Sequence, residues 1–596
     1  MGKDYDLEYF QETLKSVQEK CHSKAPDIKQ SHRKAFVETC EIFHDGLVIK
    51  NEAEDDQKKI EETGKGDREA VQDRLDKCEK AQEKAMKKCV KAANKIFKEL
   101  DMVESEKLES NILKGTIIQQ ATPEALAAFV AEIPKLHTGL IKTLFKSDNL
   151  MKEMLLNGGA KYGCFGHAMK IYTNIVTEFP EDDDKFTEVN KKLAMAVALE
   201  LASPIMEFDT KIEVDPVKRF QHYEQAHRNG ELDPAFPHFS IWELRHVINC
   251  DAKDDQLQWG RDMMMNYAPY ITTITDLKLR YMYILNSDVL TRKPTWTDTP
   301  RTYQQVLSGG GKDVQNAWFG RFICKAFGIP TWGAQQPEHM SMTRWTSEGW
   351  ETMLGATWDD CYWEDEWGTD FKAEVDARSA FTAEEYYQKL VLLEGFAEMS
   401  DGRRGNITEE EKAILHPLRL WRSLAIIQKA VMLVPASPES FERSGEGIVK
   451  TKLESYLEAM ELEQPEEEIK VEKGVCTIPP SVHGFSEGNV IVIAGAEGGQ
   501  QLNMLADAKV EYELPVDLEE DTYTLILHVC TAHLKQSPLL LSVDGGENIP
   551  IEIPYTIGKW KKTEGVEIDV HEGSTLMFTR ERPSFGLAIK KFVLKP

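Results

Sequence analysis

The sequence predicts a multidomain protein with an α-helical N-terminal region, an α+β core and an all-β C-terminal sandwich. Apolar residues recur at helical spacing in the first part of the chain and alternate with period two near its end. The length of 596 residues also exceeds what one hydrophobic core supports. We expect the segments to be 1–115, 116–235, 236–430, 431–467 and 468–596.

Residues 1–115 are dense in Lys, Glu, Asp and Gln and contain only a narrow apolar seam. The seam includes Leu75 and Ile96 and four small residues, which are Cys78, Ala85, Cys89 and Ala92. This spacing predicts long helices that pair either as antiparallel neighbours or as a parallel coiled coil. We therefore hypothesise that residues 1–115 bind a second copy of the chain or another protein.

The next segment, 116–235, keeps the helical period but is richer in core residues. Breaks at Pro123, Pro134, the acidic run 180–184 and Pro204 predict several short helices packed together. Further along, the segment 431–467 is expected to be a helical linker.

The C-terminal segment, 468–596, loses the helical period and alternates. Two predicted strands present their apolar faces as Val510, Tyr512 and Leu514, and as Tyr523, Leu525, Leu527 and Val529. A tight turn is expected at Asp544-Gly545-Gly546. These features predict a β-sandwich.

Composition excludes several functional classes. The formal charge of −28 repels phosphate backbones, so we expect no nucleic-acid partner. No stretch approaches the roughly 18 apolar residues that span a bilayer, and the first residues lack the apolar core of a signal peptide. The 10 cysteines lack close pairing, which favours reduced thiols and a cytoplasmic location.

The most informative segment is 308–363, which divides into a glycine turn, a helix and a hairpin. Gly309, Gly310 and Gly311 break the preceding structure, and Asp313 is a favoured N-cap residue. The helix that follows should end at Gly328. Its predicted buried face is Val314, Ala317, Trp318, Phe322, Ala326 and Phe327.

Two alternating runs after the helix predict an antiparallel hairpin that turns at Ser347-Glu348-Gly349. His339 lies on its first strand and Asp359 at the end of its second. If Trp345 pairs with Glu351, Asp359 becomes a diagonal neighbour of His339. A slip of one residue would give that position to Asp360.

This arrangement resembles the transglutaminase-like superfamily, whose members share a papain-like core. In that family a cysteine opens a buried helix, the helix ends in a Gly-Ile-Pro-like turn, and His and Asp follow on adjacent strands. The matching pieces here are Gly310-Gly311, Gly328-Ile329-Pro330, His339, Gly349-Trp350 and Asp359. The C-terminal segment is, in turn, similar to carbohydrate-binding modules.

The resemblance implies a triad at Asp313, His339 and Asp359, in which Asp313 occupies the position of the nucleophilic cysteine. A helix N-terminus lowers a thiol pKa and histidine moves the proton, but an aspartate cannot perform thiolate chemistry. Cys324 cannot replace it, because 11 residues of helix separate the two by about 16 Å. The sequence also departs from the family at Met340-Ser341 and after Asp360.

Three functions remain open at this stage. The first is a non-catalytic scaffold or binding protein that retains a vestigial triad. The second is an enzyme in which Asp313, His339 and Asp359 act as acid and base or ligate a divalent metal. No cofactor is predicted otherwise. On the plainest interpretation, Asp313 is only a helix cap and His339 a satisfied core histidine.

The third function is glycan binding by the C-terminal sandwich. Trp318, Trp345, Trp350 and Trp560 are candidates for stacking on a sugar or a peptide. Packing within a core or a strand explains the same aromatic residues without a ligand.

Overall fold

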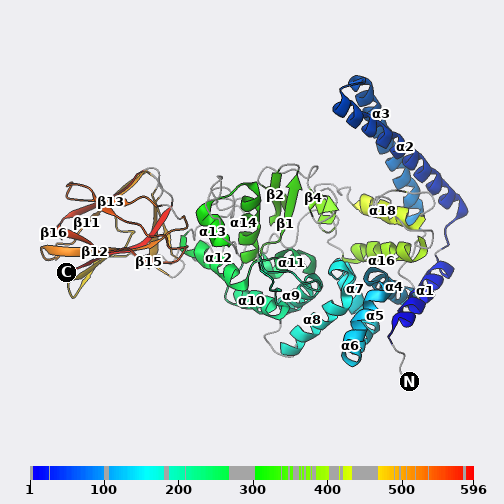
Figure 1. Ribbon diagram of the computed structural model, residues 1–596, viewed down its shortest axis with the longest axis horizontal. Helices are drawn as coiled ribbons and strands as arrows, with labels where there is room; N and C mark the ends of the chain where they lie inside the picture. Colours follow the sequence, from blue (N-terminus) through cyan, green and yellow to red (C-terminus); the bar gives the residue numbers. More distant parts are fainter. Residues whose placement is uncertain are drawn as a thin grey trace. The chain divides into compact units, whose positions relative to one another are not determined.

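The computed structural model describes residues 5–596 (Figure 1), with the exception of a set of short segments and two longer ones. The excepted residues are 26, 99–105, 180–186, 209, 268–301, 337–338, 347–348, 354–361, 364–365, 368–370, 373, 376–377, 379–383, 402–414, 416–419, 433–466, 489, 496–497, 505–506, 517, 534–535 and 582–585. The predicted linker 431–467 and the acidic run 180–184 therefore lie almost entirely outside the described residues.

The chain divides into two compact units. The first comprises 1–184, 194–203 and 372–441, and the second comprises 185–193, 204–371 and 442–596. The N-terminal part is helical and the C-terminal part contains β-sheets, as the sequence predicted at this coarse level. The boundaries between the five predicted segments remain predictions.

The first unit begins with a long helical hairpin. Helix α1 (Leu7–Ser23) precedes α2 (Gln30–Thr63) and α3 (Arg68–Phe97), which pack against each other along their length. Gly64 ends α2 in the left-handed conformation, with φ of 66°, and the short connection makes the pair antiparallel. Of the two arrangements open from the sequence, the described residues adopt the antiparallel one within a single chain.

Small residues fill the seam of this hairpin. Cys40 and Cys89 are buried and contact each other across the two helices. Ala93 is buried in place of the predicted Ala92, and Cys78 is only half-buried. Small side chains let two polar helices approach closely, so a narrow seam is enough to join them.

Short helices complete the first unit. Proline occupies the first helical position of two of them, where a missing N–H costs nothing. The helices are α4 (Glu106–Ala121), α5 (Pro123–Glu132), α6 (Pro134–Lys146), α7 (Asp148–Leu156), α8 (Phe165–Glu178), α16 (Glu384–Asp401) and α18 (Leu420–Met432). Helix α9 (Glu188–Glu200) contains the division between the two units.

The second unit combines helices with a five-stranded sheet of order β3-β2-β1-β4-β5. Its helices are α10 (Pro216–Arg228), α11 (Ile241–Ile248), α12 (Asp254–Tyr267), α13 (Tyr303–Gly309) and α14 (Asp313–Ala326). Its strands are β1 (Thr331–Gln336), β2 (His339–Thr346), β3 (Gly349–Met353), β4 (Tyr362–Trp363) and β5 (Glu366–Trp367). Helix α14 packs on β1 and β2.

The C-terminal part of the second unit is a β-sandwich with one shared core. One sheet follows the order β15-β12-β18-β10-β9, with β16, β7 and β6 attached, and the other follows β14-β13-β17-β11-β8. Its strands are β6 (Lys470–Glu472), β7 (Val475–Ile478), β8 (Phe485–Glu487), β9 (Val490–Ala494), β10 (Gln500–Met504), β11 (Ala508–Glu513), β12 (Asp521–Cys530), β13 (Leu539–Val543), β14 (Ile549–Ile551), β15 (Lys561–Lys562), β16 (Val566–Val570), β17 (Thr575–Arg580) and β18 (Leu587–Lys595).

The sequence predicted the inner faces of two of these strands correctly. The alternating residues of β11 and β12 that were expected to be apolar are buried: Val510, Tyr512, Leu514, Tyr523, Leu525, Leu527 and Val529. The predicted turn at 544–546 joins β13 to β14. A strand with one buried face repeats every two residues, so alternation alone identifies that face.

Helix α12 joins the sandwich to the rest of the second unit. The indole Nε1 of Trp259 donates to the carbonyl of Ile557 at 2.9 Å, and the Asn266 side chain donates to the carbonyl of Gly558 at 3.1 Å. Gly558 has a φ of +70°, and a Cβ at this position would lie 2.6 Å from the Cβ of Met263. Glycine is therefore required for the turn to approach the helix this closely.

Strand β10 also bonds to α12. These contacts, together with those of Trp259 and Asn266, are called here the α12 joint. Gln501 and Asn503 donate from their side chains to the backbone carbonyls of Asn266 and Tyr267, at 3.0 and 3.2 Å. The last turn of α12 leaves carbonyl groups without a partner inside the helix. Amide side chains of the sandwich satisfy two carbonyl groups at this end.

Candidate functional site

The glycine turn before α14 forms as predicted. Gly310 ends α13 with φ of 76°, and a Cβ on Gly311 would lie 2.3 Å from the Cβ of Gln315. The Gln315 side chain folds back to accept the Lys312 backbone N–H at 2.8 Å. Lys312 is therefore the N-cap and Asp313 the first helical residue, which corrects the prediction by one position.

The Asp313 carboxylate lies beside His339. His339 is the first residue of β2, and its Nδ1 lies 3.1 Å from Asp313 Oδ2. An ionised carboxylate only accepts, so the imidazole N–H is the donor. The two side chains are 46% and 29% exposed, which places the pair at a surface that solvent reaches.

The third predicted member of the triad, Asp359, lies outside the described residues, as do its alternative Asp360 and the nearby Cys361. The register on which their prediction rested is wrong by one residue, because Trp345 pairs with Trp350 and not with Glu351. Gly349 belongs to β3 and not to the turn, and this shifts the whole pairing. The structure brings together Asp313 and His339.

Buried polar groups hold the opposite end of α14. The Tyr223 hydroxyl donates to the Lys325 carbonyl at 3.0 Å, and Arg261 Nη1 donates to the Ala326 carbonyl at 2.8 Å. A cation at a helix C-terminus interacts favourably with the helix dipole. Gly328 then leaves the helix with φ of 74°, as predicted for the residue that ends it.

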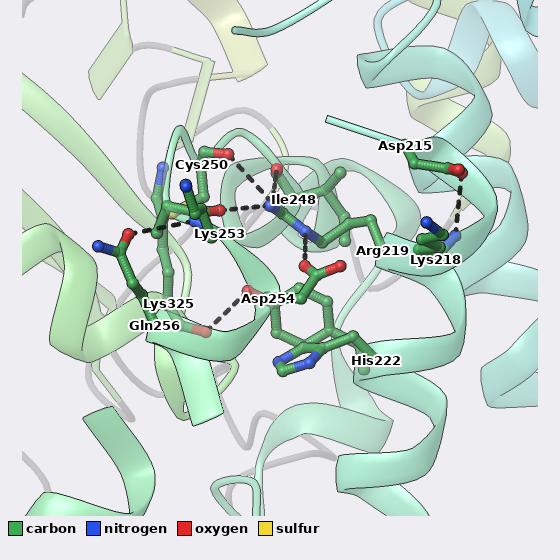
Figure 2. Close-up of polar contacts among 12 residues, drawn as sticks. Asp215, Lys218, Arg219, His222, Ile248, Cys250, Lys253, Asp254, Gln256 and Lys325 are labelled. Carbon is green, nitrogen blue, oxygen red and sulfur yellow. Dashed lines mark hydrogen bonds and ion pairs between the residues drawn. The ribbon is translucent and has the colours of Figure 1, made fainter. Parts of the chain in front are cut away.

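Arg219 organises the loop between α11 and α12 (Figure 2). Its side chain is 1% exposed, and its Nε lies 2.6 Å from Asp254 Oδ1. The remaining guanidinium nitrogens donate to the backbone carbonyls of Ile248, at the end of α11, and of Cys250 and Ala252 in that loop. Lys325 of α14 donates to the carbonyl of Asn249 in the same loop.

The loop in turn positions the first half of α14. Asp251 Oδ1 accepts from the Tyr303 hydroxyl at 2.8 Å, and Asp251 Oδ2 from Trp318 Nε1 at 3.4 Å. Tyr303 and Trp318 stack with their ring centroids 3.9 Å apart. Arg219 therefore supports, through Asp251, the helix that carries Asp313.

His222 lies in the same buried region as a neutral side chain. Its Nε2 lies 3.2 Å from Arg261 Nη1, which donates to it. Burial, followed by the nearby charges of Arg261 and Arg219, lowers the pKa of His222 to about 3. His222 therefore accepts a hydrogen bond and does not take up a proton in the folded protein near neutral pH.

Sequence reasoning did not find Arg219, Arg261 or Asp251. Arg219 does occupy the apolar face of α10, at the spacing of Tyr223 and Ala226. An arginine on an otherwise apolar helix face indicates a buried charge with partners, and the sequence contained this indication.

The predicted aromatic candidates divide between core and surface. Trp350 is 9% exposed and packs against Trp242, His246 and Phe371. Trp345 packs edge-on against Phe239. The remaining two are Trp318, whose stacking is described above, and Trp560, which is half-buried beside Lys590.

The prediction that Cys324 is no substitute nucleophile is consistent with its surroundings. It lies in the last turn of α14 and is fully buried, and burial raises its pKa to about 11. On α14, the Val314 side chain departs from the predicted buried face and is 50% exposed.

Two further searches concern only the described part of the chain. No group of three or more His, Cys, Asp or Glu residues is arranged to hold a metal ion there. Among the same residues, no helix is long and apolar enough to cross a membrane.

Comparisons with known proteins return solved structures only, because no family model and no curated protein matches the chain. The chain is similar to an exo-β-1,3-galactanase from Phanerochaete chrysosporium, at 12% identity over 22% of this chain and 30% of that chain, with a TM-score of 0.18. It is also similar to the cellobiose complex of CsCBM6-3 from Clostridium stercorarium, at 14% identity over 20% and 92% of the two chains, with a TM-score of 0.17.

A third similarity is to a family 35 carbohydrate binding module from Clostridium thermocellum, at 12% identity. It covers 22% of this chain and 98% of that chain, with a TM-score of 0.16. The neighbours are thus carbohydrate-binding modules and an enzyme of which less than a third is matched. At this level of similarity they carry no conclusion about a ligand of this chain.

Proposed function

We propose that the chain is a non-catalytic, transglutaminase-like scaffold or binding protein. The observation that carries the proposal is the contact between Asp313, in the first turn of α14, and His339, at the start of β2. The family arrangement has a thiol at the position of Asp313 and an imidazole at the position of His339. Here the thiol position carries a carboxylate.

The Asp313 carboxylate is stabilised at the helix N-terminus, but it does not support acyl transfer through a thiolate. A negative charge in the first turn interacts favourably with the helix dipole, as a thiolate would. A carboxylate is a much weaker nucleophile toward amides than a thiolate, and its only described partner, His339, donates a hydrogen bond to it. The arrangement therefore supports retention of the architecture without acyl transfer.

The direct test is incorporation of a labelled primary amine into a glutamine-bearing protein. We expect no incorporation by the unaltered chain. Asp313→Cys restores the thiol that the arrangement lacks, and a gain of activity in that variant, abolished by His339→Ala, would support the family assignment. Asp313→Ser is the matched control, since it also shortens and neutralises the side chain but supplies no thiol. Incorporation by the unaltered chain that Asp313→Ala removes would contradict the proposal.

A second candidate is an enzyme that uses the same pair in a non-thiol reaction. The 3.1 Å contact favours it, because a carboxylate next to an imidazole is a common acid and base pair. Asp359 or Asp360 would then complete either an acid/base set or a divalent metal site. Elemental analysis of the purified chain, with Asp313→Ala beside it, separates the candidates: a stoichiometric metal that the substitution removes favours the enzyme.

A further inference from the structure

Three strands of the sandwich present a row of basic side chains on one outer face. Lys562 of β15 pairs with His528 of β12, and His528 pairs with Lys591 of β18. Directly paired residues of antiparallel strands point to the same face. That face is the outer one, because Leu527 and Val529, the neighbours of His528, point into the core. With neighbouring strands about 4.8 Å apart, the row spans about 10 Å.

An aromatic ring and a further cation border this row. Trp560 lies two residues before Lys562, directly ahead of β15. Lys590 lies where the register between β12 and β18 shifts, and its Nζ is 5.6 Å from the centroid of the Trp560 ring. Together, Trp560, Lys562, His528, Lys590 and Lys591 form what is called here the basic platform.

Helix α12 holds the turn that leads into Trp560. The turn that leads into Trp560 receives hydrogen bonds from α12, which reach Ile557 and Gly558. A ring that is ordered before a ligand arrives loses less conformational entropy when the ligand binds. The turn before the ring is thus held by a helix that lies about 300 residues earlier in the chain, in line with the separation of 298 between Trp259 and Ile557.

Carboxylates of the described residues do not neutralise the charges of Lys562 and Lys591. Within the described residues, neither Lys562 nor Lys591 forms an ion pair, although acidic residues outnumber basic ones by 100 to 72 in the chain. Burial, and then the charges of Lys591, Lys562 and Lys590, lower the pKa of His528. The two lysines therefore present positive charge on either side of His528 that a bound anion would neutralise.

We propose that the basic platform binds an anionic polysaccharide. The Trp560 ring can stack on the apolar face of a sugar, and the ammonium groups can bind the carboxylate or sulfate that the sugar carries. An acidic peptide would pair with the lysines but would not account for the ring beside them. The proposal gives a ligand class to the binding role proposed above, and it does not depend on the chemistry of Asp313.

Affinity electrophoresis of the full chain in gels that contain a polysaccharide tests this proposal. Polygalacturonate supplies carboxylates, dextran sulfate supplies sulfates, dextran is the neutral reference, and polyglutamate stands for an acidic protein. We expect retardation by one or both charged polysaccharides and none by dextran, and the comparison between the two identifies the anion.

The double variant Lys562→Gln and Lys591→Gln should bind about tenfold more weakly, as expected for the loss of two exposed charge contacts. Trp560→Ala should also weaken binding. The control is Lys470→Gln with Lys509→Gln, which changes the charge equally on β6 and β11 and should leave binding unaltered. Equal losses in both double variants, tighter binding to polyglutamate, or no retardation by either charged polysaccharide would overturn the proposal. The amine-incorporation assay is independent of these outcomes.

Discussion

Arg219 holds the loop whose Asp251 contacts α14. Its guanidinium satisfies one carboxylate and three carbonyls, and Asp251 in the same loop holds Tyr303 and Trp318. Removing one partner of a buried ion pair leaves the other partners without their hydrogen bonds, and this costs more than the pair contributes.

We therefore expect Arg219→Met to lower the free energy of unfolding by about 3 kcal/mol. Arg228→Met is the matched control, because Arg228 lies on the same helix with its side chain 51% exposed and should change stability by less than about 0.5 kcal/mol. Thermal unfolding monitored by near-ultraviolet circular dichroism measures both. Similar shifts in the two variants would contradict the role given to Arg219.

His222 should make the protein sensitive to acid. The pKa of His222 is lowered to about 3 in the folded state. Below about pH 6.5, His222 therefore binds a proton in the unfolded chain but stays neutral in the folded chain. Above pH 6.5 the His222 side chain does not reduce the free energy of unfolding. As the pH falls from 6.5 toward 3, it lowers the free energy of unfolding by up to about 1.4 kcal/mol per pH unit.

His222→Gln should flatten the dependence of the unfolding temperature on pH between 4 and 6. His571→Gln is the control, since this exposed histidine lies beside Asp544 and its pKa is raised, chiefly by a hydrogen bond to the Glu572 carbonyl. An unchanged acid slope in His222→Gln would show that other groups cause it.

At the scale of elements, the turn at Gly558 lies against both the side chain and the backbone of α12. Gly558→Ala places a methyl group against both the side chain and the backbone of Met263, and it strains a residue with φ of +70°. Gly545→Ala has the same backbone strain, with φ of +71°, but its methyl group meets nothing within 4 Å.

We expect Gly545→Ala to cost about 1 kcal/mol from backbone strain alone and Gly558→Ala to cost clearly more. Only Gly558→Ala should also expose Trp259, whose indole bonds to the neighbouring Ile557. Tryptophan fluorescence with an added quencher measures that exposure. Equal quenching in the two variants would mean that the joint tolerates the added methyl group.

Elements with a strong local period could be predicted from the sequence, and elements that depend on distant partners could not. The inner faces of β11 and β12 and the end of α14 followed from residues 508–530 and 309–328 themselves, and the start of α14 was predicted to within one residue. Strand β1 was missed, because its short segment shows no alternation and is buried on both faces for most of its length. The hairpin register was wrong because Gly349 indicated a turn and instead begins β3.

The candidate site was predictable to the same extent. The pairing of Asp313 with His339 was implied by the resemblance to the transglutaminase-like superfamily, and the two side chains lie 3.1 Å apart. The network of Arg219 and Arg261 connects α10, α12 and the end of α14, and no local pattern records such contacts. Whether Asp359 joins Asp313 and His339 remains a prediction.

At the scale of the whole molecule, self-association through the N-terminal helices remains a proposal. Helix α2 exposes Ile42, Val48 and Ile49 to between 46% and 53%, and Ile42 and Ile49 are seven residues apart on one side of the helix. An apolar stripe of this spacing on a polar helix can pair with its copy in a second chain.

The double variant Ile42→Gln and Ile49→Gln should lower the sedimentation coefficient if the chain self-associates through this stripe. The control Leu136→Gln and Ile212→Gln removes two apolar side chains that are equally exposed elsewhere. Identical sedimentation of all three proteins as monomers would rule out association through α2.

The α12 joint also has a consequence for the order in which the chain folds. Ile557, the partner of Trp259, is synthesised 298 residues after it. Helix α12 therefore leaves the ribosome well before the sandwich that covers it. Contacts of such large sequence separation form late, and until then an apolar helix surface is open to non-native association. Synthesis of the C-terminal sandwich, and not of the core itself, would then set the time at which the second unit becomes complete.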